Sequence, residues 1–546
     1  MTQETQDQPH FFYNATLWAG NKVEPIKGWF SVMGGKFQTV HAGDLPAQRK
    51  RNSTNLNGRH VLPGLVDCHS HLSVSAWIPF TLDGSGWHNK SDLLRDVRLQ
   101  AKKLDADAWI IAFYADFFRL GALPSLLELN EAAQGRPLII QDFSLHKGLA
   151  SEAAYERASI SRMNFSSRDL ETNKQGVPTG LLKETVNGHT LSIALTQFAQ
   201  QFESLNMQSL LQAEANRHLS LGIVECHDPC MHPKLQTSAE RFERQTPLKF
   251  SWSHVKSHEQ ADYVSDNVCL SCGAGPRSAK MFLDGADDCA LCLKPSDVLK
   301  MSARSVGQAV VGKVDTLRAM SRVKLTYREG KIRTPFLRLP HDGVTQQIVE
   351  LAEQGVRPKI HALGNEAVSC ACDSLQKSGV TDATVEHLVL MSDDNLEQVA
   401  RSGAVASLQP GFLQQAKALA ASNVHCVLKV IPAKSLSQVD VPIALSSDNP
   451  CGPLNPLANI RRAVTRLSDD GLLVDENESL SPSEAIRAYS IGGQQAIHGR
   501  PGVGIEARAP ANFVVISGHP MHSYSEVMET WIDGECVFSQ GWSTLV

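Results

Sequence analysis

The sequence predicts an α/β protein: a (β/α)8 TIM-type barrel with a large cap insertion and a small β-sandwich domain built from both termini. Through the middle of the chain, short apolar segments alternate with longer helical patterns, as βα units do. There are eight such segments, the number that a closed barrel needs. They lie at residues 61–66, 222–226, 248–252, 279–283, 357–360, 383–385, 404–408 and 441–445.

The spacing of these segments locates the cap. Several of them follow one another at about the spacing of single βα units, whereas the gaps 67–221 and 285–356 are far longer. The first gap is long enough to cover a barrel mouth. We therefore expect a cap insertion over residues 73–215 within a metal-dependent barrel that spans residues 61–502.

The sequence pattern at both ends of the chain is typical of short strands and turns. Gly34 and Gly35 separate two alternating runs, which is a hairpin signal. Residues 511–516 and 529–534 look similar. Residues 1–60 and 503–546 should therefore form one composite β domain.

Composition excludes several classes of protein. Of the 546 residues, 42% are hydrophobic and 20% charged, as in an ordinary globular protein. The net charge is −5 and no long basic run occurs, which argues against a nucleic-acid or membrane-surface partner. No apolar window reaches the 18 residues of a membrane span. The polar start lacks the plan of a signal peptide, so we expect a cytoplasmic protein.

Polar side chains cluster where the predicted strands end. His69 and His71 follow the first strand, and the two-residue period of a strand puts both imidazoles on one face, where they can share a metal ion. Residues at the carboxyl ends of barrel strands converge on one site. The later strands contribute a further set of ligand-type residues: Lys280, His361, His387 and Asp448.

This ordered set resembles the amidohydrolase superfamily, in the branch that includes N-substituted formamide deformylases (amidohydrolase family 3). The resemblance covers nearly the whole chain and rests on residues 62–71, 280–285, 360–364, 386–387, 447–448 and 504–512.

The resemblance implies a site with two metal ions, expected to be zinc. His69 and His71 would bind one ion, and His361 and His387 the other. Carbamylated Lys280 would bridge the two, since a carbamate is an anionic oxygen ligand and an ammonium is not. Asp448 would bind the first ion and exchange a proton with the bridging water.

The cap of this branch also has counterparts here. His146 matches a histidine that faces the substrate, and we expect it to contact the substrate. Glu184 falls in another matching stretch but is interpreted as an acid on a helix face. The chain departs from the family pattern at Asn365 and at residues 286–292 and 112–115, which leaves the substrate open.

Two Cys-x2-Cys pairs, Cys269 with Cys272 and Cys289 with Cys292, fit the spacing of a zinc ribbon. They flank the strand that carries Lys280. Because an extended strand would hold them roughly 25 Å or more apart, we expect unrelated thiols, with a structural zinc site as the alternative. In the predicted reducing compartment most cysteines should be free.

The predicted function is a metal-dependent amidohydrolase that cleaves a C–N amide or formamide bond, not a peptide bond, through a metal-bound hydroxide. Its partner would be a small-molecule amide, and self-association as a homo-oligomer is left open. Two alternatives stay open: a deaminase or cyclic-amide hydrolase on the same metal site, and a non-catalytic regulatory barrel.

Overall fold

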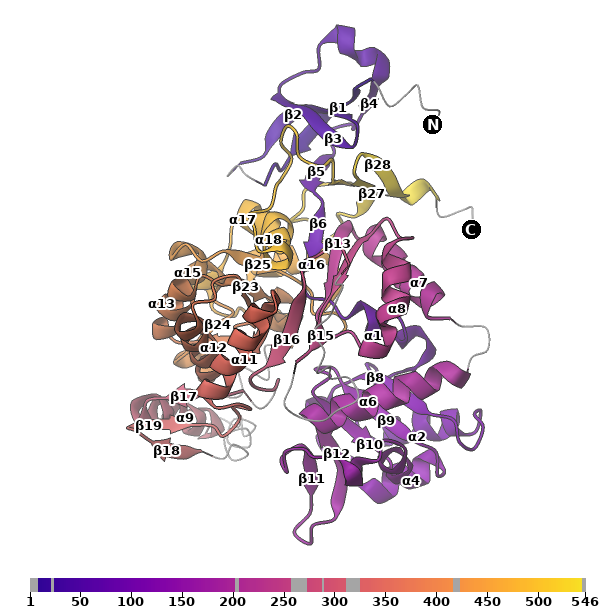
Figure 1. The fold of residues 1–546 in the computed structure, drawn as a ribbon, viewed down its shortest axis with the longest axis vertical. Coiled ribbons are helices and arrows are strands. Elements are labelled where there is room, and N and C mark those ends of the chain that lie inside the picture. Colours follow the sequence, from indigo (N-terminus) through magenta and orange to yellow (C-terminus); the bar gives the residue numbers. More distant parts are fainter. Residues whose placement is uncertain are drawn as a thin grey trace.

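The computed structural model describes residues 8–20, 24–201, 206–256, 273–286, 289–310, 325–415 and 423–542. Three groups of elements are visible in Figure 1: a β-sheet with strands from both ends of the chain at the top, a central set of parallel strands with helices around it, and an α/β cap at the lower right.

The central strands are buried and parallel, which explains why they read as continuous apolar runs. Each of the eight predicted segments contains a strand. These strands are β6 (Leu65–Asp67), β13 (Ile223–Asp228), β14 (Lys249–Trp252), β16 (Ser278–Phe282), β20 (Arg357–Ala362), β21 (Thr384–His387), β23 (Val405–Leu408) and β25 (Ile443–Leu445). A further short strand, β15 (His254–Val255), lies outside the predicted segments.

Strand pairing confirms the α/β class but gives no closed barrel among the described residues. One sheet has the order β14-β13-β6 and the other β15-β16-β20-β21-β23-β25. Ser253 separates β14 from β15. At the other junction, β6 and β25 do not pair, and loop contacts take the place of a ladder: Asp448 N–H donates to the His69 carbonyl (2.8 Å) and His71 N–H to that of Asn449 (2.8 Å).

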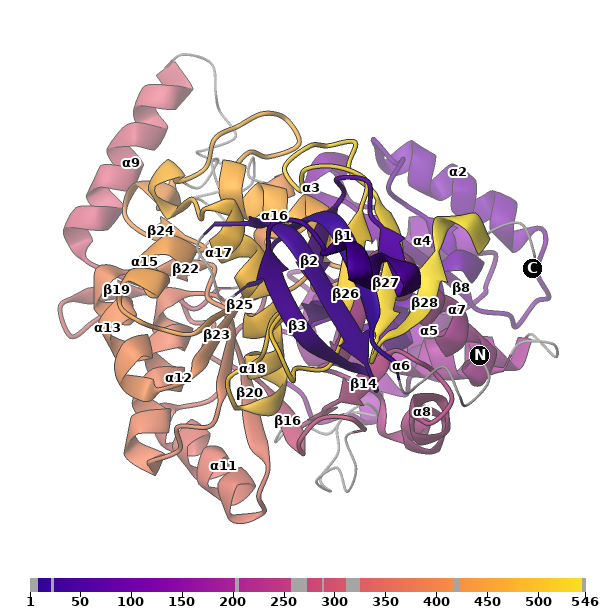
Figure 2. The same ribbon diagram turned by 90° about the horizontal axis from the view of Figure 1, so that it is seen from above.

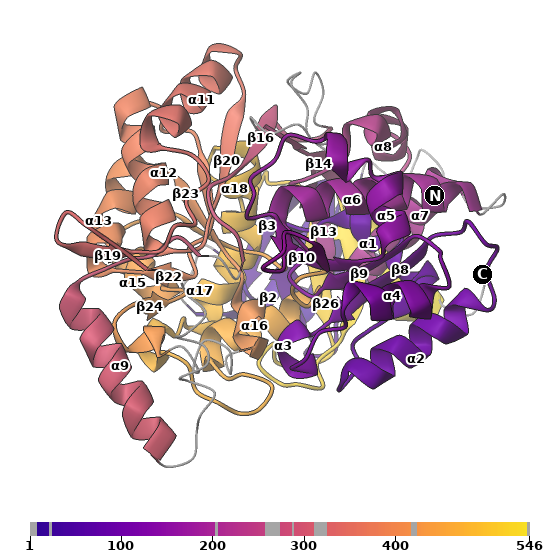
Figure 3. The same ribbon diagram turned by 90° about the horizontal axis from the view of Figure 1, so that it is seen from below.

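Helices cover the outside of these strands. They include α7 (Met207–Ser220), α8 (Gln236–Glu243), α11 (His341–Glu353), α12 (Asn365–Ser378), α13 (Asp393–Ser402), α15 (Ala433–Gln438), α16 (Pro456–Thr465), α17 (Pro482–Arg487) and α18 (Gly493–His498). Helix α9 (Pro295–Val310) instead lies at the edge of the molecule, against β19 (Lys331–Arg333) (Figure 3). Across the described ranges, no helix is both long enough and apolar enough to cross a membrane.

The cap sheet has the order β11-β12-β10-β9-β8-β7. Both of its faces are buried, since Ile110 and Ala112 pack in one apolar cluster and Ile111 and Phe113 in another. Figure 3 shows the cap opposite α11–α13. Its elements are α1 (Leu72–Ser75), β7 (Leu82–Asp83), α2 (Lys90–Ala101), β8 (Ile110–Ala115), α3 (Phe117–Leu120), α4 (Leu126–Ala133), β9 (Leu138–Asp142), β10 (Lys147–Ala150), α5 (Glu152–Arg157), β11 (Leu170–Thr172), β12 (Pro178–Lys183) and α6 (Glu184–Phe198).

Strands from both ends of the chain lie side by side in the terminal sheet, as Figure 2 shows from above. Hydrogen-bonded pairing joins these strands in one sheet, not in two stacked sheets. The strand pairing therefore does not show the predicted β-sandwich. The strands are β1 (His10–Leu17), β2 (Ile26–Met33), β3 (Lys36–Ala42), β4 (Ser53–Asn55), β5 (His60–Pro63), β26 (Phe513–Ile516), β27 (Val527–Ile532) and β28 (Glu535–Ser539).

Gly64 marks the point where the chain leaves the terminal sheet and enters the central one. It separates β5 from β6, so the apolar run predicted as one strand belongs to two sheets. A Cβ atom at Gly64 would lie 2.5 Å from Val224 Cγ2 and 3.1 Å from Asn512 Cβ. The close approach of the two sheets therefore depends on glycine at this position.

We expect Gly64→Ala to lower the free energy of unfolding by about 1–3 kcal/mol, because the added methyl group overlaps Val224. Gly86→Ala is the matched control, since a Cβ atom there meets nothing within 4 Å. Denaturant unfolding of both variants measures the difference. Equal stability of the two would contradict the close approach.

Candidate metal centre

All seven residues predicted for the site line a single cavity of about 390 Å³ between the central strands and the cap. They are His69, His71, His146, Lys280, His361, His387 and Asp448. The cap contributes to the same cavity through α1 and α6.

The first ligand-type cluster forms where β6 and β25 end. His69 Nε2 lies 3.2 Å and His71 Nε2 lies 3.1 Å from Asp448 Oδ1. Ligand atoms from these three residues lie within 4.8 Å of one another. Two imidazole nitrogens and a carboxylate oxygen form a ligand set suited to zinc.

The second cluster is centred on His387. Its ring lies 4.4 Å from that of His361 and 4.8 Å from that of His69, measured between centroids. His387 Nδ1 donates to Gln409 Oε1 (2.9 Å), and the Gln409 amide in turn donates to Ser446 Oγ (2.9 Å). These hydrogen bonds engage Nδ1 and leave Nε2 of His387 as the nitrogen with a free lone pair. Histidine ligands of metals are commonly oriented in this way.

Two residues of this site have strained backbone conformations. His387 has φ +79° and Asp448 φ +54°, in the left-handed region that residues with a Cβ atom rarely adopt. Such conformations persist where the surroundings hold them, and functional sites are the common place. Here they turn both side chains into the cavity at the strand ends.

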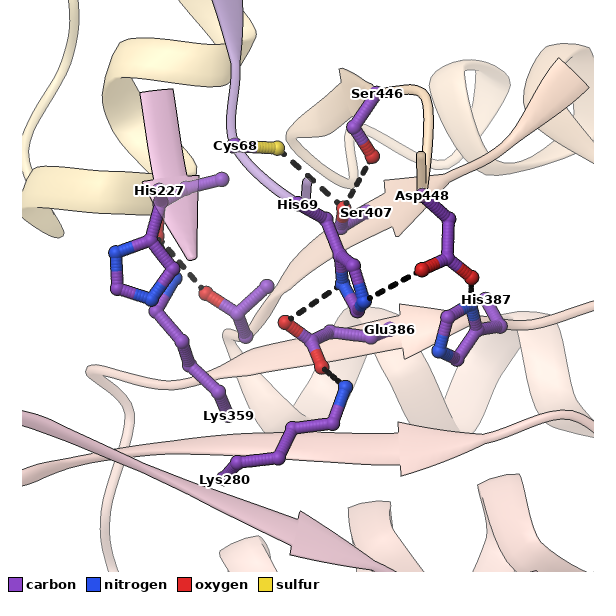
Figure 4. A network of polar contacts seen from close by, with 12 residues as sticks. Cys68, His69, His227, Lys280, Lys359, Glu386, His387, Ser407, Ser446 and Asp448 are labelled. Atoms are coloured by element: carbon purple, nitrogen blue, oxygen red, sulfur yellow. Dashed lines mark hydrogen bonds and ion pairs between the residues drawn. The ribbon is translucent and has the colours of Figure 1, made fainter. Parts of the chain in front are cut away.

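Glu386 connects the two clusters. One of its oxygens lies 3.1 Å from His69 Nδ1, and the other accepts a short contact from Lys280 Nζ. Figure 4 shows Glu386 between these two side chains and Asp448 between His69 and His387. Both Lys280 and Glu386 are about 1% exposed.

The pKa values reflect burial and crowding of charge. Burial, helped by His69, lowers the pKa of His387 to about 3. Burial and the imidazole of His387 hold the pKa of His361 well below its usual value. Both rings are therefore neutral at physiological pH, the form that binds metals.

His69 differs because two carboxylates flank it. Burial by itself lowers its pKa, but Glu386 and Asp448 raise it more, and the net pKa lies above the ordinary value. Burial opposes ionisation of Asp448, yet His69 and His71 hold its pKa well below the usual range. The two carboxylates therefore favour a positive charge between them, which a protonated His69 or a bound cation can supply.

Several buried polar atoms at this centre make no hydrogen bond within the described chain: His69 Nδ1, His361 Nε2, Glu386 Oε1 and Asp448 Oδ1. His69 approaches Glu386 and Asp448 closely, at 3.1 and 3.2 Å, without hydrogen-bond geometry. Buried polar atoms are normally paired, and a coordinated cation would satisfy them. These residues fit a divalent metal ion.

Comparison with known proteins identifies the family. A model of the amidohydrolase family matches residues 54–538. The chain belongs to this family. As an amidohydrolase it is 23% identical over 506 residues to the N-substituted formamide deformylase of Arthrobacter pascens, with 88% of each chain covered. It is 23% identical over 566 residues to the putative amidohydrolase YtcJ of Bacillus subtilis, with 97% and 98% covered.

Solved structures share the architecture. An uncharacterised metal-dependent hydrolase from Pyrococcus horikoshii aligns with TM-score 0.65 and 17% identity, covering 94% of this amidohydrolase and 98% of that chain. Another from Pyrococcus furiosus aligns with TM-score 0.62 and 18% identity, covering 94% and 100%. At these identities the likeness shows the fold alone.

Sequence reasoning assigned no role to Glu386 and placed Glu184 on a helix face. A strand period would turn Glu386 away from its neighbour His387, but the positive φ of His387 brings both to the site. Glu184 is the first residue of α6 and lines the cavity, where its Oε2 lies 2.8 Å from His146 Nδ1. Its interpretation as a helix-face acid was wrong.

The second Cys-x2-Cys pair, Cys289 and Cys292, is partly exposed and does not line this cavity. Cys289 Sγ donates to the Ala286 carbonyl (3.3 Å). Cys269 and Cys272 lie outside the described residues. The structural zinc site therefore stays an untested alternative.

We expect the amidohydrolase purified without chelator to contain about two equivalents of divalent metal per chain. His361→Ala should reduce this to about one, because it removes a ligand of the second cluster. Exposed His88→Ala is the control and should not change the content. Elemental analysis measures all three, and no difference between the His361 and His88 variants would contradict the assignment.

Proposed function

We propose that this amidohydrolase cleaves the C–N bond of a small, non-peptide amide or formamide with the help of two zinc ions. The observation that supports this most is the pair of ligand-type clusters that share His69 and adjoin one cavity. A divalent ion held by these side chains would polarise the amide carbonyl and lower the pKa of a water molecule.

Asp448 is the proton carrier in this proposal. Its carboxylate is ionised at neutral pH, as its depressed pKa shows, and therefore able to accept a proton. Asp448 Oδ1 faces His69 and His71, while Oδ2 lies 3.9 Å from His387 Nδ1. The carboxylate thus sits between both clusters, where it takes the proton of the attacking water and delivers it to the leaving nitrogen.

The cavity wall suggests what the amide carries. Away from the ligands, the wall is largely apolar, and one part of it comes from a packed cluster of the cap and α7: Val74, Trp77, Leu191, Leu195, Ala199 and Met207. Such a wall binds an apolar substituent through burial of its surface. The name of one relative, N-substituted formamide deformylase, agrees with an amide that carries a substituent.

Lys280 is proposed to carry a carbamate that bridges the two ions. A carbamate so close to Glu386 would bring two negative charges together in a buried site. Two divalent cations would offset this repulsion, so carbamylation and metal binding should depend on each other.

A deaminase or cyclic-amide hydrolase would use the same metal centre and differ in its substrate. A non-catalytic regulatory barrel is the third hypothesis. The full set of predicted ligand-type residues at one cavity favours catalysis over it.

The decisive experiment is a screen of N-formyl, N-acyl and cyclic amides, aminopurines and dipeptides with the zinc-loaded protein. Release of amine from N-substituted amides with apolar substituents would support the proposal. Activity restricted to dipeptides, ring opening or deamination would replace it. If none of these compounds is hydrolysed, the hypothesis of a non-catalytic regulatory barrel is favoured.

Asp448→Asn should lower kcat by at least about 10²-fold on the best substrate, because the amide cannot accept the water proton. It should retain the fold and much of the metal, since an amide oxygen of the same size remains. Steady-state kinetics and elemental analysis measure both. Near-normal turnover would remove Asp448 from the proton path.

Lys280→Ala should lose both metal and activity, because it removes the bridging anion. Short carboxylic acids should restore part of both by occupying the vacated space. Lys377→Ala, at an exposed position of α12, is the control. Two metal equivalents and full turnover in Lys280→Ala would show that no bridging carbamate is needed.

A further inference from the structure

A line of charged side chains connects the central strands to the cap beside the metal centre. His146 lies in the turn between β9 and β10, and its Nδ1 donates to Glu184 Oε2 (2.8 Å). The backbone N–H of Glu184 donates to the His146 carbonyl (2.8 Å). Glu184 therefore holds both the main chain and the ring of His146.

The turn that carries His146 is supported from behind. Leu145 has φ +60°, and its carbonyl accepts a hydrogen bond from Asn187 Nδ2 (2.7 Å). Asn187 and Gln141 exchange two hydrogen bonds between their buried side-chain amides, at 2.9 and 3.0 Å. A strained turn is thus held in one conformation, in which the His146 ring lies 5.1 Å from that of His361.

The Glu184 carboxylate lies against the main chain that follows β16. A Cβ atom at Gly285 would overlap Glu184 Oε1, so only a glycine leaves room for the carboxylate. Glu184 itself has φ +42°, a left-handed conformation for a residue with a side chain. Both features show a carboxylate held in one place by its surroundings at a cost in strain.

Arg338 supplies the opposite charge from the central unit. Its backbone N–H donates to the Leu283 carbonyl (2.8 Å), which ties it to the end of β16. Its Nη2 donates to Asp169 Oδ2 (3.0 Å) and Thr185 Oγ1 (2.7 Å) in the cap. Its Nη1 lies 3.9 Å from Glu184 Oε2, the oxygen that His146 contacts.

We propose that Glu184 and Arg338 are positioning residues that hold the His146 ring over the metal-binding side chains, so that His146 contacts the substrate only while the cap is seated on the central strands. With Nδ1 engaged by Glu184, Nε2 is the ring nitrogen left to contact a ligand in the cavity. The catalytic consequence rests on the proposed hydrolysis; the positioning itself does not.

Double-mutant kinetics on the best substrate of the screen test this. Glu184→Ala should lower kcat/KM by about 10–100-fold through misplacement of His146, with metal content unchanged. Glu184→Gln should recover most of the loss, because its amide oxygen still accepts from Nδ1–H. In a His146→Ala background, Glu184→Ala should cost nothing further. Glu131→Gln, an exposed acid on α4, is the matched control and should match the wild type.

Additive losses from Glu184→Ala and His146→Ala would overturn the proposal, because Glu184 would then act independently of His146. Wild-type kcat/KM in Glu184→Ala would overturn it as well.

A second measurement needs no substrate. In the free protein, Glu184→Ala and Arg338→Lys should each speed amide hydrogen exchange in residues 144–147 relative to the wild type and to Glu131→Gln. Arg338→Lys keeps the charge but cannot reach all three cap partners at once. Unchanged exchange in both variants would overturn the positioning role. If the wild type hydrolyses no amide but exchange rises as expected, the proposed function fails and the positioning stands.

Discussion

The metal centre depends on the junction of two chain segments far apart in sequence, 67–71 and 446–449. Ser447 N–H donates to Asp67 Oδ1 (3.0 Å), Asp448 N–H to the His69 carbonyl, and His71 N–H to the Asn449 carbonyl. These bonds set the two histidines and the aspartate opposite one another. They also bring together the short strands β6 and β25, which do not pair with each other.

Burial of charge is the second constraint. His69 lies between Glu386 and Asp448 with almost no exposure to water, and Lys280 is packed against Glu386. Separating such charges from solvent is costly unless each is matched by an opposite charge. Against the effect of burial, close pairing of opposite charges both raises the pKa of His69 and depresses the pKa values of Glu386 and Asp448. Divalent cations at the same position would satisfy the ligand-type atoms that lack hydrogen bonds.

Much of this could be predicted from sequence where the signal is local. Buried parallel strands read as apolar runs, and the polar residue that ends each run points to the common edge. This pattern predicts His69, His71, Lys280, His361, His387 and Asp448 at one site, and all six line the same cavity. The fold was less predictable at Gly64, where one apolar run serves two sheets, and at the edges, where closure depends on loop contacts instead of strand pairing. Glu386 was passed over because a two-residue period assumes ordinary φ values, and His387 does not have one.

Glu184 and Arg338 illustrate a further limit, because their contacts exist only after the cap has packed on the central strands. Arg338 follows Glu184 by 154 positions in the chain, and no pattern near either residue indicates the other. The same geometry separates two tasks in the molecule. The strand ends carry the charged cluster and are constrained by its electrostatics, whereas the wall residues of α1, α6 and α7 are apolar and are constrained mainly by packing. Hydrophobic positions tolerate exchange of one apolar side chain for another far better than a buried charge cluster tolerates loss of a partner. Substrate choice can therefore change in the cap while the reaction at the strand ends is retained. The contacts of His146 with Glu184, and of Glu184 with Arg338, are where the cap and the central strands must keep their relative position.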